Sequence, residues 1–412
     1  MQKSTKKWLA ASLVAALVVG FAPQASSATT TINYWYWKEN PSSTVVRDLA
    51  VKFEAKTGIH VNISDDVTSA NYFNNLTNAI AAGNAPDATE LNTPQLPQLL
   101  KANALAPLNA NIKTWSKSSD VTSSLWKWVK SADGKTTYAL PWKYLMFLML
   151  YRKDTFAAAG IKVPTTQKEF LAAAAKLYKP DKGQYAFNLR GANGSDQWAS
   201  FMVAGGAKFT NISGDIAFDS QLTRDANNIY ISSYKYAPPS TITSNSGTAL
   251  VNELEAGVTA MVINHIGGAR ALKNPANVGF APIPSRKGGD ARTTYMGTMN
   301  MNAILNTSKQ KDAAFKWISY LAENEAQLAV AQSKEGFLPV TNTVAADPSF
   351  KDDAAFQLSA QLAQHPTLAW PTVPGTTIVA TTAWAPAMQS ALLGKSTSDD
   401  MVRAVAAALA QR

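Results

Sequence analysis

Residues 138–160 read YALPWKYLMFLMLYRKDTFAAAG, and the order of residue types in this stretch predicts how the rest of the chain is arranged. Residues 145–150 form a wholly apolar run that is too short to span a membrane and is typical of a strand buried on both faces. Pro141 cannot donate a hydrogen bond to a sheet, so it fits the end or edge of a strand. We interpret the stretch as a strand that leaves one domain near Pro141 and enters a second, with a binding cleft beside it.

The overall composition limits the class of protein. The chain has 412 residues, which favours two domains, and its 46% hydrophobic and 16% charged residues are typical of a folded chain. The absence of cysteine excludes disulfides, thiol chemistry, cysteine-bound zinc and the lipid-bearing cysteine of bacterial lipoproteins. The three histidines are too dispersed to form a ligand set, and we expect no metal and no cofactor.

The first 28 residues have the pattern of a cleaved signal peptide. Three lysines within residues 3–7 precede a mostly apolar run, 8–21, and small residues follow at 26–28. A retained membrane helix is the alternative, but an apolar run of 14 residues is short for a span. We expect cleavage after Ala28 and secretion into a Gram-negative periplasm.

The positive charge of the chain is dispersed. The formal net charge is +10, and removal of residues 1–28 leaves +7. Basic and acidic residues alternate, and no basic run or nucleic-acid-binding motif is present. We therefore expect no nucleic-acid partner.

The mature chain opens with a β-α-β pattern. Residues 31–37 and 59–64 have strand composition, and residues 42–56 between them have apolar positions at helical spacing. This order predicts a parallel sheet and an α/β fold. Another short strand begins at residues 86–87. Ligands of open α/β sheets collect at the carboxyl ends of strands, so the residues that follow these strands are candidates for a site.

Further along the chain, helices alternate with proline-bearing extended runs. Residues 167–177 are predicted to be a helix, and residues 311–332 are predicted to be one long amphipathic helix. The runs 278–284 and 336–340 contain proline, as Pro141 does, and are candidates for second and third passages between domains.

Eight motifs, in this order, resemble the bacterial extracellular solute-binding proteins of ABC transporters, the group that includes maltose-binding protein. They span most of residues 31–412: KFEAKTGIHV, AGNAPDATEL, YALPW with LYRKDTFAAAGI, VPTTQKEFLAAAAKL, LEAGVTAMVIN, VGFAPIPSRKGG, KQKDAAFKWISYLAENEAQ and GFLPV. Each motif is unspecific alone, and their shared order carries the resemblance.

The resemblance implies a two-domain periplasmic-binding-protein fold of type II-like architecture, with three hinge crossings and a ligand cleft between the lobes. It implies an N-terminal lobe of residues 29–141 plus 282–336 and a C-terminal lobe of residues 142–281 plus 337–412. It also implies a monomer without catalytic activity that binds a sugar, closes about the hinge and delivers the sugar to membrane permease subunits.

A sugar pocket needs aromatic surfaces and buried polar groups. The resemblance and the positions at strand ends and crossings together suggest these ligand-binding candidates: Trp37, Lys38, Glu39, Glu90, Asn92, Trp142, Lys143, Arg190, Asn193, Asn264, His265, Tyr295, Gly297, Thr298 and Trp370. Each has a plainer alternative. The tryptophans can be core residues. The polar residues of the first domain can cap helices or be solvated, and His265 can be a structural hydrogen-bonding group.

Three hypotheses about function follow, two for the ligand of a binding protein and one for an enzyme. The chain lacks the acidic and aromatic run that maltose-binding protein has after its Pro-Asp motif, so a mono- or disaccharide or a polyol is expected rather than a linear maltodextrin. Glycerol phosphate or another anionic solute is the alternative, because Lys38, Lys143 and Arg190 lie near the expected cleft. A glycosidase that uses Glu39 and Glu90 is a third hypothesis, but no nucleophile motif supports it.

Overall fold

The computed structural model describes residues 30–38, 42–191, 193–211, 213–243, 246–289, 292–334 and 336–411. The expected signal peptide and Glu39 lie outside these residues. Within these ranges, no helix combines the length and the apolar character needed to cross a bilayer.

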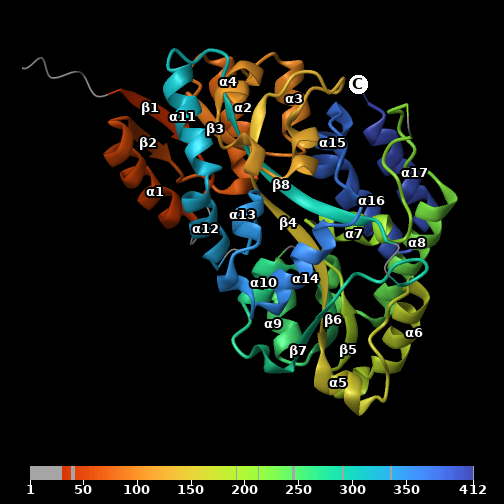
Figure 1. Cartoon of the computed structure of the whole chain (residues 1–412). Coiled ribbons are helices and arrows are strands. Elements are labelled where there is room, and N and C mark those ends of the chain that lie inside the picture. Colours follow the sequence, from red (N-terminus) through yellow and green to blue (C-terminus); the bar gives the residue numbers. More distant parts are fainter. Residues whose placement is uncertain are drawn as a thin grey trace, which may run out of the picture.

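One mixed sheet organises the molecule (Figure 1). Its main path runs β2-β1-β3-β8-β4-β6-β5, while β10 pairs with β8, and β7 and β9 pair with β4. The strands are β1 (Thr31–Trp35), β2 (His60–Ser64), β3 (Ala88–Asn92), β4 (Ala139–Arg152), β5 (Tyr185–Asn188), β6 (Thr259–His265), β7 (Val278–Ala281), β8 (Thr294–Ile304), β9 (Leu338–Pro339) and β10 (Thr367–Leu368).

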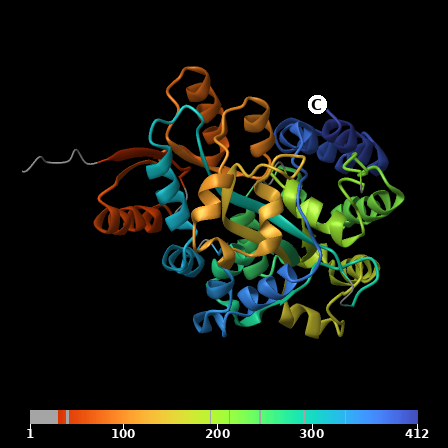
Figure 2. The same cartoon turned by 45° about the horizontal axis from the view of Figure 1, so that its top comes forward.

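Helices pack on both sides of this sheet (Figures 1 and 2). Those of the first half are α1 (Ser42–Thr57), α2 (Ser69–Ala81), α3 (Leu96–Lys101), α4 (Asn109–Thr114), α5 (Lys153–Ala158), α6 (Gln167–Leu177), α7 (Ser195–Ala204) and α8 (Gln221–Ser232). The others are α9 (Gly247–Glu255), α10 (Ile266–Arg270), α11 (Lys311–Leu321), α12 (Asn324–Gln332), α13 (Asn342–Ala345), α14 (Ala354–Ala363), α15 (Pro374–Ile378), α16 (Trp384–Leu392) and α17 (Ser398–Leu409).

The predicted β-α-β opening is confirmed. β1 pairs in parallel with both β2 and β3, and α1 packs against β2. Ile32 and Tyr34 of β1 are fully buried while their neighbours along the strand are more exposed, because successive side chains point to opposite faces of a sheet. This region has a core of its own, in which Tyr34, Phe53 and Trp317 pack together.

β4 is the central strand, and it extends well beyond the apolar run that predicted it. Its first residues pair with β8, and its last residues pair with β6 and β7. The register against β8 shifts between Pro141 and Lys143, an irregularity that accommodates a proline without a donor inside the strand. One strand therefore connects the two halves of the molecule, as the sequence predicted.

Two further passages are expected between the domains, and the structure differs from this prediction at one of them. β9 pairs with Lys143 and Tyr144, where the third passage was expected. The segment that begins at Pro282 does not leave the second half: the Ser285 N–H donates to the Thr165 carbonyl at 3.0 Å and the Arg286 N–H to the Ala204 carbonyl at 3.1 Å. β8, which follows this segment, pairs with both β3 and β4. The domain boundary near 282 stays a prediction.

The predicted helix 311–332 is wrong in one respect, since it is divided into α11 and α12. Glu323 between them has an extended conformation. The buried Gln327 side chain donates to the Leu321 and Trp142 carbonyls, both at 2.8 Å, and accepts the Val340 N–H at 2.7 Å. The Gln327 amide thus binds a carbonyl at the end of α11 and links this helix to β4 and to the residue after β9.

The third passage contains a glycine that no other residue can replace without strain. Gly336 has a φ of +72°, and an added Cβ would lie 2.3 Å from the Gly267 backbone nitrogen. Gly394 has a similar φ of +68°, but an added Cβ there would meet no atom within 4 Å.

These two glycines allow a matched prediction. Gly394→Ala is expected to cost about 1 kcal/mol of unfolding free energy from the left-handed backbone alone. Gly336→Ala is expected to cost at least about 2 kcal/mol, because α10 must also move away. Urea unfolding of both variants checks this, and equal losses would show that the contact with α10 has no consequence.

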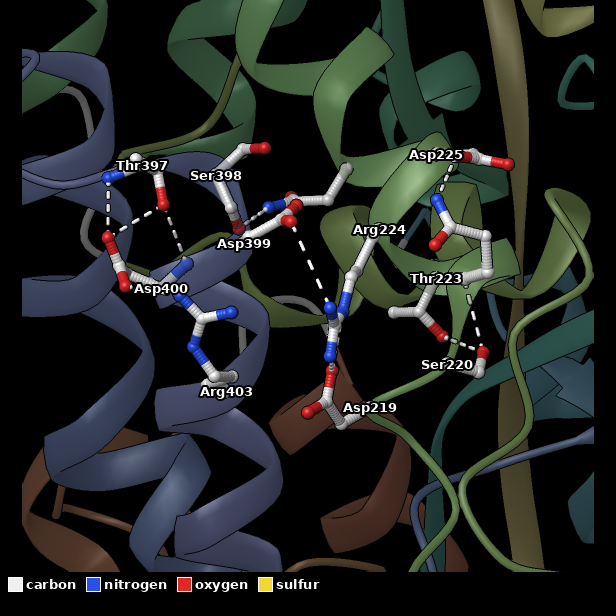
Figure 3. A network of polar contacts seen from close by, with 12 residues as sticks. Asp219, Ser220, Thr223, Arg224, Asp225, Thr397, Ser398, Asp399, Asp400 and Arg403 are labelled. Atoms are coloured by element: carbon white, nitrogen blue, oxygen red, sulfur yellow. Dashed lines mark hydrogen bonds and ion pairs between the residues drawn. The ribbon is translucent and has the colours of Figure 1, made fainter.

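A polar network on the surface joins α8 to α17 (Figure 3). Arg224 donates to Asp219 and lies 4.0 Å from Asp399, and the Asn227 amide donates to the Ser398 carbonyl at 2.7 Å. Thr397 and Asp400 form a reciprocal capping box at the start of α17. The last helix is therefore held to the second half at its first turn.

This network predicts an acid-dependent loss of stability. Hydrogen bonds from Thr397, followed by Arg403, lower the pKa of Asp400 from 3.8 to about 2. Because the folded-state pKa is depressed, the stabilisation is present above the unfolded value and is lost as pH falls from 4 to 2. The melting temperatures of the wild type and Asp400→Asn should differ above pH 4 and converge near pH 2, whereas a constant difference would contradict this.

Candidate functional site

A carboxylate at the start of α7 accepts three hydrogen bonds from two separate segments, β8 and the loop that contains Trp370. Asp196 accepts hydrogen bonds from the Tyr295 hydroxyl, from Thr298 Oγ1 at 2.9 Å and from Trp370 Nε1 at 2.9 Å. Its position in the first turn of a helix is favourable for a negative charge. Tyr295 and Thr298 come from β8, so the same side chain ties α7 to a hinge strand.

A half-buried cation, Arg190, lies near this carboxylate. Burial lowers the pKa of Arg190, and the charge of Asp196 offsets part of that effect. The start of α9 lies next to this arginine, since a Cβ added at Gly247 would make ordinary contacts with Arg190 Nη1 at 3.7 Å and with Asn264 Nδ2 at 3.6 Å. Arg190 and Asp196 therefore bring a positive and a negative charge into the same region, where the carboxylate acts on the guanidinium electrostatically.

His265 completes this group in a neutral state. Burial, followed by the charge of Arg190, lowers its pKa to about 4. Its Nδ1 accepts the Gly267 N–H at 3.1 Å and so caps α10, and its ring lies edge-on to Phe147 at 6.0 Å. The ring therefore does not titrate between pH 5 and 8.

The structure thus brings together seven side chains, of which the sequence predicted six. We call them the Asp196 cluster: Arg190, Asp196, Asn264, His265, Tyr295, Thr298 and Trp370. Sequence reasoning missed Asp196. The available signal was a carboxylate directly after a glycine-broken loop, in the first turn of a predicted helix.

Three other candidates form a buried group at the hinge. Lys143 Nζ lies 3.4 Å from Glu90 Oε1, and neither side chain is exposed to solvent. The Asn300 amide donates to the same Glu90 oxygen at 2.6 Å. The ammonium also lies 4.2 Å from the ring centroid of Trp142, which is fully buried. These residues have structural roles here, and their contact with a ligand stays a prediction.

The remaining candidates are dispersed around these two groups. Trp37 is 5% exposed and packs edge-on against Tyr72, so its indole face is part of the core. Lys38 and Asn193 are exposed, and Asn92 is half-buried at the end of β3. Gly297 lets β8 approach β4, since an added Cβ would lie 2.7 Å from the Phe147 ring.

No group of three or more potential ligands for a metal occurs in the ranges of the chain that the structure covers. The Asp196 cluster offers charged and neutral hydrogen-bonding groups beside aromatic rings, and this chemistry suits binding of a polar organic solute.

Comparison with known proteins places the chain in a family. The family model described as bacterial extracellular solute-binding protein matches residues 48–357. The chain belongs to this family. The fold expected from the resemblance, two-domain and α/β, is confirmed by solved structures. One is an ABC transporter solute-binding protein of Thermotoga lettingae bound with α-D-tagatose. It superposes with a TM-score of 0.77 at 22% identity and covers 92% of this chain and 99% of its own.

Two relatives of this solute-binding protein have named ligands. The diacetylchitobiose binding protein DasA of Streptomyces coelicolor is 26% identical over 357 residues, which cover 81% of this chain and 78% of that protein. The mannitol-binding protein of Pseudomonas aeruginosa is 30% identical over 216 residues, which cover 49% of this chain and 48% of that protein.

Proposed function

We propose that this solute-binding protein is the substrate-binding component of an ABC importer, and that it binds a small neutral sugar or polyol at the Asp196 cluster. The family, and relatives whose names specify an amino-sugar disaccharide and a hexitol, support the class of ligand. We further propose that it acts as a monomer in the periplasm after removal of its signal peptide, without lipid anchor, cofactor or catalysis.

The single observation that carries the proposal is a carboxylate, Asp196, that lies near enough to the Arg190 guanidinium for its charge to act on it. A carboxylate accepts hydrogen bonds from hydroxyl groups, and a guanidinium donates to hydroxyl and ring oxygens. Their opposite charges offset one another, which favours a neutral polyhydroxylated ligand over an anion. The neutral His265 adds a further polar group without adding charge.

The arrangement of the hinge suggests how binding is communicated. Asp196 on α7 is bonded to Tyr295 and Thr298 of β8, which pairs with both β3 and β4. A ligand that shares the Asp196 carboxylate changes these bonds near the start of β8. We propose that closure of the two lobes follows and presents both of their surfaces to the permease.

Isothermal titration against mannitol, tagatose, diacetylchitobiose and glycerol phosphate tests the proposal. Saturable heat is expected with at least one neutral compound, with little dependence on salt between 50 and 500 mM. Binding of glycerol phosphate alone, weakened by salt and lost in Arg190→Ala, would favour the anionic alternative. No heat with any compound of a wider sugar and polyol panel would count against the proposed ligand class.

A further inference from the structure

A second cavity lies on the other face of the hinge strands. Its volume is about 730 Å³, within the usual range for small-molecule sites, and Met146 of β4 and Met296 of β8 form part of its lining. The adjacent residues on the same strands, Phe147 and Tyr295, belong with His265 and Asp196. Because neighbouring side chains of a strand point to opposite faces, this cavity is separate from the Asp196 cluster.

The walls of the cavity come from two segments far apart in the sequence. One is the 3-10 segment Ser123–Val129, which precedes β4, and the other comprises α13, α14 and residues 364–367. Figure 2 shows the orange segment before β4 in front of the centre of the molecule, with the blue C-terminal segment passing beside it. Many lining side chains are small, including Ala345, Ala360 and Ala363, so the walls leave the space open.

None of the twenty lining residues is a carboxylate, and the one charged side chain among them, apart from His365, is Lys127. Trp128 Nε1 is buried and has no hydrogen-bond acceptor among the residues that the structure covers. Lys127 Nζ lies 4.5 Å from the Trp128 ring and donates to the Thr367 carbonyl at 3.3 Å. A lysine ammonium carries three donors, so this contact does not use its full capacity.

Desolvation lowers the pKa of Lys127, and no acidic neighbour contributes to the shift. One cationic donor, Lys127 Nζ, thus lies at the edge of a space that is otherwise lined by apolar, hydroxyl and amide groups.

We propose that this cavity is a second ligand site, which binds a small organic anion with an apolar body. The anionic group accepts from Lys127 Nζ, and the apolar body lies against Met146, Met296 and the alanines of α14. A neutral sugar fits less well, because the lysine ammonium covers one face of the Trp128 ring and the lining offers no carboxylate to accept from hydroxyls.

The test uses 8-anilinonaphthalene-1-sulfonate, an aromatic sulfonate, with the sugar-free protein, so its outcome is independent of the proposed sugar site. Saturable fluorescence enhancement is expected for the wild type. Lys127→Gln should weaken binding about five- to tenfold, since the lost partner is charged but partly exposed. Lys117→Gln, on the preceding 3-10 turn and outside the cavity lining, is the control and should bind as the wild type does.

A second variant tests the location of the site. Ala360→Phe places a ring in the cavity and should abolish the saturable component, while an unchanged circular dichroism spectrum and a cooperative thermal transition confirm that the protein is folded. Inorganic phosphate, which lacks the apolar body, should compete only weakly. Equal binding by the wild type and Ala360→Phe, or equal weakening by Lys127→Gln and Lys117→Gln, would overturn the proposal.

Discussion

Replacing Asp196 with alanine is expected to weaken binding of the best ligand from the sugar and polyol panel by roughly 30- to 100-fold. The substitution removes a charged acceptor for ligand hydroxyls. It also leaves the Tyr295 hydroxyl and the Trp370 indole N–H without the acceptor that positions them. Titration calorimetry of the two proteins measures the change.

Two further variants separate a role in binding from a role in folding. Asp196→Asn keeps the shape and one acceptor oxygen, so it should retain stability better than it retains affinity. Asp181→Ala removes an exposed carboxylate on a distant turn and should change neither. If Asp196→Ala lowered the unfolding free energy but left the affinity unchanged, the cluster would be structural and the site would lie elsewhere.

Replacing Lys143 with methionine is expected to lower the free energy of unfolding by about 3–5 kcal/mol. The substitution leaves the Glu90 carboxylate buried without the ammonium that lies 3.4 Å from it. The loss should appear as a lower urea midpoint. Glu90→Gln/Lys143→Met should recover a large part of it, because the charge that needs a partner is then removed as well.

A surface ion pair supplies the control for this prediction. Lys52 lies 3.3 Å from Glu325, and both side chains are well exposed, at 55% and 39%. Lys52→Met should therefore change the free energy of unfolding by less than about 1 kcal/mol. If Lys143→Met had an equally small effect, Glu90 would be stable in the interior without its lysine.

The positions of strands and most helices were predictable because they depend on local patterns. The apolar run 145–150, with Pro141 before it, was sufficient to predict a central strand that joins two halves. The capping box at Thr166 and Glu169 likewise marked the start of α6. The division between α11 and α12 was not predictable, because Gln327 forms its three hydrogen bonds with residues of two other segments.

The candidate site was predictable only in part. Arg190 and Tyr295 could be named because the resemblance implies that their segments contact the ligand, and His265 could be named because it ends a predicted strand. Position in the sequence did not show which strand-end residues belong to the Asp196 cluster and which are buried in the interior of the protein. Glu90 and Lys143 are both at strand positions near the expected cleft, yet the structure pairs them in the interior.

The sequence by itself determined the α/β class, the order of elements, the central hinge strand and the family. These follow from hydrophobic periodicity, proline and glycine positions and motif order, all of which are local properties of the chain. The tertiary structure alone decided that Asp196 joins α7, β8 and Trp370, that Lys143 is buried against Glu90, and that a cavity lies behind the hinge. Such contacts join residues up to 210 positions apart in the chain, and their partners are fixed only when the strands are paired and the helices packed.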